Sequence, residues 1–246
     1  MSRSFLELMN LISIHQSFLT MKTQFFFFCA LFSGLAIFSC NSESSDTVDQ
    51  DRIFTVYELF YNANDDKTYA RATFHFSNEL GTNLQLAGDS KVTFEGDPLT
   101  FNPVLAYYER EYAGFVATGA FEWTDTEGSL FRNTVEIHPI SFAPGIDTID
   151  RSQSYELFWE GGDLKANEIV LLTINGENEG DARIFSTNDV GANSIILGKN
   201  KLSEIGQGPG TAFLERSYLP GIQEAPTVGG RITGRQRAEN LEVYMK

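Results

Sequence analysis

The chain has 246 residues, of which 33 are acidic and 18 basic, giving a formal net charge of −15. Nucleic acids and anionic lipid headgroups are also negative, so this balance argues against binding either of them through the protein's own surface. Both cysteines lie within the first 40 residues, so the remainder can form neither a disulfide nor a cysteine-ligated metal site.

The N-terminal segment has the order of an export signal. Lys22 follows Met21, residues 25–38 carry no charge, and the small residue Ser39 precedes Cys40. The apolar stretch is too short to span a bilayer by itself. We therefore predict that residues 1–39 are a signal region, with Met21 as an alternative start. An ordinary secretory signal or a short buried apolar segment would give a similar pattern.

The last four residues of this segment, Ile37-Phe38-Ser39-Cys40, resemble the lipobox of bacterial lipoproteins. The resemblance implies cleavage before Cys40, lipidation of its thiol with palmitate-type chains, and anchoring to the outer membrane on its periplasmic or outer side. Residues 41–51 are polar and acidic, and they resemble the surface-export signal of Bacteroidota lipoproteins. Their composition predicts that residues 40–51 form a short disordered tether.

Beyond the tether, the dominant hydrophobic period is two residues. In residues 69–76, Ala70, Ala72, Phe74 and Phe76 alternate with more polar residues, which is typical of a half-buried strand. Turn-forming clusters separate such runs. Residues 200–206 form at most one helical turn. Further strands are predicted at 53–61, 91–95, 119–124, 129–137, 153–159, 168–174, 193–197, 211–218 and 239–245.

Four short blocks recur in the same order, beginning with Tyr57-Glu58-Leu59-Phe60 and Tyr155-Glu156-Leu157-Phe158. They predict a tandem duplication with units at 52–142 and 148–246. Each unit has the size and strand count of an immunoglobulin-like sandwich. We therefore predict an all-β protein with two tandem immunoglobulin-like β-sandwiches, resembling immunoglobulin-like lipoproteins. The predicted core residues are Phe74, Phe76, Phe94, Phe121, Trp123 and Val135, then Leu157, Trp159, Val170, Leu172, Ile196, Phe213 and Ile232.

Groups suited to catalysis or metal binding are sparse in the mature chain. His75 and His138 are its two histidines, no Gly-x-Ser-x-Gly elbow occurs, and we expect both imidazoles to be solvated. The acid pairs Glu95/Asp97 and Asp125/Glu127 lie in predicted turns. Residues 177–181 are rich in oxygen donors but depart from the EF-hand pattern, so a solvated turn is preferred. We predict no enzyme activity, no metal site and no cofactor.

The motif Ala-x-x-Glu-Arg-x-Tyr occurs in both predicted units. In a strand, Tyr108, Arg110 and Tyr112 share one face, as do Arg216 and Tyr218. An arginine between aromatic rings can recognise a carboxylate or a sugar, so these five residues are candidates for ligand binding. The alternative, which we prefer, is that each arginine braces a loop of the fold.

These features favour a lipid-anchored binding or structural module of the cell envelope, and we expect it to bind another envelope protein. A carbohydrate-binding surface lipoprotein is the alternative, with tyrosines such as Tyr107, Tyr108 or Tyr112 as a stacking platform. A hydrolase would need converging buried polar groups that the sequence does not display.

Overall fold

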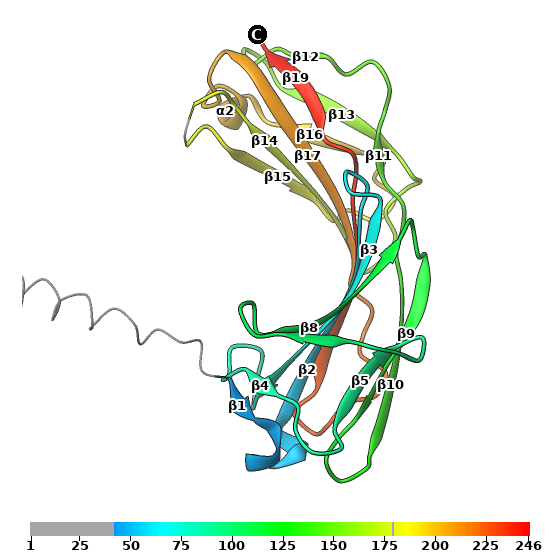
Figure 1. Cartoon of the computed structure of the whole chain (residues 1–246). Coiled ribbons are helices and arrows are strands. Elements are labelled where there is room, and N and C mark those ends of the chain that lie inside the picture. The colour runs from blue at the N-terminus through cyan, green and yellow to red at the C-terminus, as the bar shows by residue number, and fades with distance from the viewer. Residues whose placement is uncertain (1–41, 179) are drawn as a thin grey trace, which may run out of the picture. The chain divides into compact units, whose positions relative to one another are not determined.

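The computed structural model describes residues 42–178 and 180–246, and Ser42–Lys246 forms one compact unit. The predicted signal region, the predicted start at Met21 and the predicted lipidation site Cys40 lie outside the described residues. The described part is almost entirely β-structure, arranged as two β-sandwiches with separate hydrophobic cores (Figure 1). The all-β sandwich fold predicted from the period of two is confirmed.

The first sandwich packs two sheets around a core rich in aromatic residues. One layer has the order β18-β2-β3-β8-β7, in which β18 (Gly230–Arg237) comes from near the C-terminus, and the other has the order β10-β9-β5-β6. The strands contributed by the N-terminal half are β2 (Ile53–Asn62), β3 (Lys67–Phe76), β5 (Lys91–Phe94), β6 (Asp97–Pro98), β7 (Thr100–Asn102), β8 (Tyr107–Ala113), β9 (Thr118–Thr124) and β10 (Leu130–Glu136).

The second sandwich has the two-layer arrangement of an immunoglobulin-like domain. A small sheet, β11-β13-β16, covers a layer in which β14, β15, β17 and β19 pair side by side. The elements are β11 (Ser141–Phe142), β12 (Thr148–Ile149), β13 (Tyr155–Glu160), β14 (Glu168–Asn175), β15 (Arg183–Thr187), β16 (Ser194–Leu197), helix α2 (Lys199–Leu202), β17 (Gly208–Tyr218) and β19 (Leu241–Met245).

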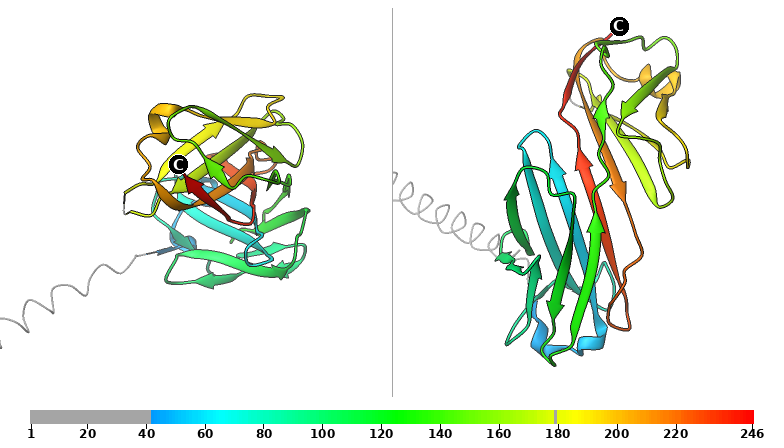
Figure 2. Two further views of the ribbon diagram at one scale, coloured as in Figure 1. Left: turned by 90° about the horizontal axis from the view of Figure 1, so that it is seen from above. Right: turned by 90° about the vertical axis from the view of Figure 1, so that its right-hand side faces the viewer.

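One strand joins the two sandwiches into a single ten-stranded sheet. After β17 the chain extends as an arm, residues 219–237, that contains β18 (Gly230–Arg237). This strand pairs with four residues of β17, but it pairs over its whole length with β2, in parallel. Ile232 on β18 is fully buried in the first core, not the second. Figure 2 (right) shows the arm, orange to red, beside the strands of the first sandwich.

The same arm also covers the free edge of β10. The side chain of Gln223 accepts a hydrogen bond from the Thr134 amide at 2.6 Å, and that of Glu224 accepts one from the Arg132 amide at 2.6 Å. In return, the side-chain oxygen of Asn133 accepts hydrogen bonds from the backbone amides of Gln223 and Glu224. An unpaired edge strand is a site of unwanted association, and these side chains occupy it.

The predicted tandem duplication is wrong. Strands β2 and β3 form an antiparallel hairpin within one sheet, whereas their aligned counterparts β13 and β14 lie in opposite layers. Tyr57 is fully buried in the middle of β2, while Tyr155 is half-buried at the start of β13. The aligned blocks therefore do not occupy equivalent positions in two copies of one fold.

The predicted disordered tether is also corrected. Strand β1 (Glu43–Ser44) pairs with β4 (Leu84–Gln85), and two 3-10 turns follow at Ser45–Thr47 and Gln50–Arg52. Ser45 and Gln50 are buried, and Gln50 donates to the carbonyls of Ser45 and Val48 at 2.8 and 3.0 Å. The polar side chains that suggested disorder instead satisfy backbone groups, so the fold begins three residues after Cys40.

Most predicted core positions are buried; three are not, and a fourth, Ile232, is buried in the other core from the one predicted. Phe76 is half-buried beneath the guanidinium of Arg52, 4.5 Å from the ring centroid. Ile196 points to solvent from β16, and Phe213 lies half-buried on the outer side of β17. Ile232 is buried in the first core. Alternation alone gives the phase of a strand but not which face meets a second layer, and Ile196 and Phe213 lie on the uncovered side.

Candidate functional site

The five predicted ligand-binding residues do not form one site. Tyr108, Arg110 and Tyr112 lie on β8 in the first sandwich, whereas Arg216 and Tyr218 lie at the end of β17, where the second sandwich meets the arm. The two motifs also differ in environment. Arg216 is 2% exposed, while the Arg110 side chain is 44% exposed.

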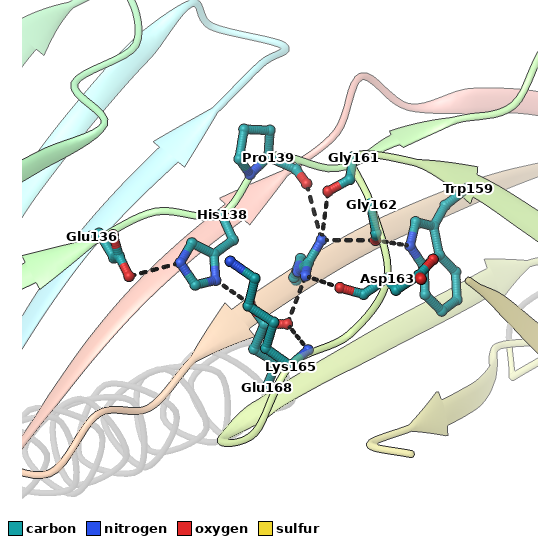
Figure 3. A network of polar contacts seen from close by, with 10 residues as sticks. Glu136, His138, Pro139, Trp159, Gly161, Gly162, Asp163, Lys165 and Glu168 are labelled. Carbon is teal, nitrogen blue, oxygen red and sulfur yellow. Dashed lines mark hydrogen bonds and ion pairs between the residues drawn. The ribbon is translucent and has the colours of Figure 1, made fainter. Parts of the chain in front are cut away.

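Arg216 is the centre of a buried polar network, and Figure 3 labels its partners Pro139, Gly161, Gly162, Asp163 and Glu168. Its guanidinium donates to the carbonyls of Gly161, Gly162 and Asp163 at 2.9, 3.2 and 3.0 Å, and to that of Pro139 at 3.4 Å. It also forms a 2.6 Å ion pair with the Glu168 carboxylate. These acceptors come from the segment joining the two sandwiches and from the loop after β13. Arg216 therefore braces loops, as the preferred interpretation of the motif predicted.

Glu168 opens β14 and is buried with Arg216. Burial alone would raise the pKa of its carboxyl group. Hydrogen bonds donated by Arg216, the Lys165 amide and His138 offset the burial and hold this pKa below its ordinary value. The carboxylate is therefore ionised, and its partners are three protein donors.

His138 is not the solvated residue that its position before Pro139 suggested. Its side chain is 16% exposed, Nδ1 contacts the Glu168 carboxylate, and Nε2 lies 2.9 Å from Glu136. The ring stacks on Tyr218 with centroids 4.7 Å apart. A general base needs a ring nitrogen directed at a substrate proton. Both nitrogens here face carboxylates, so the geometry is that of a structural link.

The predicted binding residues on β8 likewise make their contacts within the first sandwich. Tyr108 is buried, and its hydroxyl accepts a hydrogen bond from the Leu86 amide at 2.7 Å. Tyr112 donates to the Phe94 carbonyl at 3.2 Å, and burial together with the nearby Asp97 carboxylate raises its pKa to about 12. Arg110 reaches Asp97 only at 3.9 Å. No stacking platform of Tyr107, Tyr108 and Tyr112 forms, because Tyr107 faces the opposite side of β8 from the other two.

A second region, which the sequence did not reveal, is the outer side of the ten-stranded sheet, opposite both cores. We call it the open face. A ladder of alternating charges crosses five of its strands through side chains that all point outward. Arg71 pairs with Glu109 at 2.6 Å and Glu58 at 3.4 Å, and Arg235 pairs with Glu58 at 2.9 Å. The ladder continues through Glu215, which contacts Arg235 at 3.3 Å and Arg237 at 2.5 Å.

The arginines of this ladder also cover aromatic rings. The Arg71 guanidinium lies 4.7 Å from the Tyr69 ring centroid and 5.4 Å from that of Tyr107. The Arg235 guanidinium lies 4.2 Å from the Phe60 centroid. Cations over aromatic faces attract the ring quadrupole, most strongly where water is partly excluded. The ladder residues are therefore held in place by stacking as well as by charge.

Two shallow hollows flank the ladder on the open face. One, of about 250 Å³, is lined by residues that include Arg71, Thr73, Tyr107, Arg231 and Thr233. The other, of about 310 Å³, is lined by residues that include Leu171, Ile184, Phe213 and Arg237. Glu58, Arg71 and Glu215 lie on predicted strands, whereas β18, which carries Arg235 and Arg237, was not predicted as a strand. Nothing in the sequence indicated that β2 and β18, whose paired residues are 175 positions apart, are neighbours.

Within residues 42–178 and 180–246, no group of three or more His, Cys, Asp or Glu side chains is placed to hold a metal ion. The same residues contain no helix long and apolar enough to cross a membrane.

Comparisons with known proteins assign no family. No family model matches the chain, and no curated protein matches it. Among solved structures, the similar ones include a 1.5-MDa bacterial ice-binding adhesin (11% identity, TM-score 0.24, covering 84% of this chain). Others are chicken CNTN1 FN1–FN3 domains (9%, 0.23, 70%) and a Salmonella alpha-2-macroglobulin mutant (10%, 0.24, 85%). This chain spans 66%, 62% and 15% of those structures, respectively, less than two thirds of each.

Proposed function

We propose that this protein is a lipid-anchored, non-catalytic module of the bacterial cell envelope that binds another envelope protein through the open face. The observation that carries the proposal is the charge ladder, whose arginines lie over aromatic rings on an uncovered sheet face between two hollows. Arginine and aromatic residues are the types enriched at the energetic centres of protein interfaces.

The ladder is suited to binding because it is already ordered. Arg71, Glu58 and Arg235 are each about one quarter exposed, so they are partly desolvated before any partner arrives. Ordering a long side chain costs about 0.5–1.5 kcal/mol on association, and a side chain fixed in advance avoids most of that cost. The alternating signs favour a partner whose charges alternate in the complementary register, which gives specificity.

A protein fits this face better than a glycan. Sugar binding by stacking needs a free aromatic plane, and on the open face the guanidinium of Arg235 lies over Phe60 while that of Arg71 lies over Tyr69 and Tyr107. In the buried His138–Glu168–Arg216 network both His138 nitrogens face carboxylates and Arg216 is paired with Glu168, so the network offers no support for hydrolysis.

The anchor is proposed from the lipobox resemblance at Cys40. Lipidation there places the protein on the outer membrane, facing the periplasm or the cell surface. The ordered strand β1 starts at Glu43, so only two residues separate such an anchor from the first sandwich.

Site-specific photo-crosslinking in the envelope tests the proposed binding face. A benzophenone amino acid at Thr73, beside the ladder, is expected to capture one discrete protein, because a preorganised interface selects a single partner. The matched control places the same probe at Phe158, which is exposed on the outer side of the other layer of the second sandwich. In the Thr73 probe protein, Arg71→Glu with Arg235→Glu should reduce the adduct at least tenfold, whereas Arg183→Glu, at an exposed ion pair remote from the ladder, should not.

Equal capture from both faces, or an adduct unaffected by the double reversal, would contradict the proposal. Specific retention on a polysaccharide panel that depends on Tyr107 would favour the glycan alternative instead.

A further inference from the structure

The loop between β7 and β8, residues 102–106, has the composition of a membrane-inserting loop. Val104 is 81% exposed and Leu105 is 56% exposed, and Pro103 beside them is also exposed. No charged residue occurs from Leu99 to Tyr108. We propose that this loop inserts into the lipid bilayer beside the anchor, so that the first sandwich is attached to the membrane at two points. The inference rests on the proposed lipidation of Cys40.

The backbone N–H groups of the loop already have hydrogen-bond partners within the protein. A backbone N–H that enters hydrocarbon without a partner costs several kcal/mol, which keeps most loops out of bilayers. Here Asn102 accepts a hydrogen bond from each backbone N–H of residues 103–106. Its side-chain oxygen accepts from the amides of Val104 and Leu105 at 3.0 and 3.2 Å. Its carbonyl accepts from Ala106 at 2.8 Å, and Pro103 has no N–H.

The length of chain between Cys40 and the fold holds this end of the sandwich at the membrane. Strand β1 begins at Glu43, and three extended residues reach at most about 11 Å. An acylated Cys40 lies at the lipid headgroups, so β1 must lie within about that distance of them.

The loop lies close to β1 through a short series of contacts. Strand β1 pairs with β4, the next residue Leu86 donates to the hydroxyl of Tyr108, and Tyr108 follows the loop on β8. The Ala87 amide also donates to Ser45 just after β1, at 3.0 Å. A bilayer held against β1 is therefore within reach of Val104 and Leu105.

The two other most exposed apolar residues, Leu80 and Val190, each follow an acidic residue. Leu80 follows Glu79, which forms an ion pair with Arg231, and Val190 follows Asp189 on the second sandwich. Burying either residue would carry a carboxylate toward the bilayer, which is costly. The charge-free run around Val104 avoids this cost, even though the protein as a whole is acidic.

The test uses full-length protein, processed and lipidated in cells, then reconstituted in phosphatidylcholine vesicles. Cleavage removes Cys29 and acylation blocks Cys40, so one added cysteine is the sole free thiol for an environment-sensitive fluorophore. With Val104→Cys we expect a blue shift, a severalfold rise in emission, and quenching by lipids labelled in the acyl chain. Val190→Cys, at a site that is 72% exposed, is the matched control and should show none of these.

Palmitate labelling of wild type against Cys40→Ala is measured in parallel and separates the two claims. Unlabelled wild type overturns the anchor and, with it, the insertion. Labelled protein in which the 104 probe stays as solvated as the 190 probe overturns the insertion alone. A twelve-residue Gly/Ser insertion after Ser42 lengthens the connection between Cys40 and β1. It should lower the fluorescence of the probe at position 104 at least twofold while palmitate labelling persists. An unchanged fluorescence would contradict the role of the short connection between Cys40 and β1.

Discussion

Arg110 and Arg216 occupy the same place in the same sequence motif, yet they have opposite environments. Arg216 is buried with five oxygen partners, including the Glu168 carboxylate, whereas Arg110 is largely solvated and lies 3.9 Å from Asp97. The neighbours explain the difference. β17 runs through the middle of the ten-stranded sheet beneath the connecting segment, while β8 lies near its end. A shared sequence motif therefore does not determine whether an arginine is structural.

The largest effect that tests this contrast is expected for Arg216→Ala. The substitution leaves the Glu168 carboxylate buried without its cation and leaves loop carbonyls without donors. Breaking one partner of a buried ion pair costs about 3–5 kcal/mol. The free energy of unfolding from urea denaturation should fall by that amount. Arg216→Lys should recover only part of the loss, because an ammonium cannot follow the fork geometry of the guanidinium. A change below about 1 kcal/mol for the alanine variant would mean that the network is not stabilising.

An intermediate effect on the free energy of unfolding is expected when the pH is lowered. The pKa of Glu168 lies below its ordinary value of 4.5 in the folded protein, so the unfolded chain takes up this proton first as pH falls. The stabilisation from this group is therefore complete above about pH 4.5, and it is lost as pH drops through the lowered folded pKa.

Urea denaturation of wild type and Glu168→Gln between pH 6 and pH 3 measures this contribution. The stability of the glutamine variant should depend less on pH below about pH 5. Glu136→Gln, at the exposed end of the His138 contact, is the control and should keep the wild-type slope. Parallel curves for wild type and Glu168→Gln would refute the assignment.

The smallest effect is expected for Arg110→Ala. An exposed ion pair at this separation contributes about 0–1 kcal/mol, and salt screens most of it. The free energy of unfolding should change by no more than about 0.5 kcal/mol, and less in 0.5 M NaCl. A loss comparable with that of Arg216→Ala would show that the two arginines are equivalent, and the contrast between them would fail.

Much of the fold class was available from the sequence alone. The strict alternation around Ala70, Ala72 and Phe74 predicted a half-buried strand, and those three residues are buried on β3. Alternation is local, because successive side chains of any strand point to opposite faces. The absence of cysteine after Cys40 is equally local information, and it excludes disulfides from the folded part by count alone.

The candidate site could not be derived in the same way. The ladder joins Glu58, Arg71 and Glu109 to Arg235 and Glu215, and these residues meet only because the arm crosses to pair β18 with β2. His138 became part of a buried network for a similar reason, since Glu168 and Tyr218 reach it from β14 and β17. Local alternation does not indicate which strands far apart in the chain become neighbours.

The sequence by itself determined the strand periodicity, the acidic balance, the lack of cysteines in the folded part, and an apolar, charge-free stretch before Tyr108. The tertiary structure alone decided that residues 43–52 are ordered, that Ile232 belongs to the first core, and that Arg216 rather than Arg110 is buried. The physical reason is the range of the forces. Side-chain alternation and turn chemistry act over a few residues, whereas burial depends on which distant surfaces pack together and exclude water.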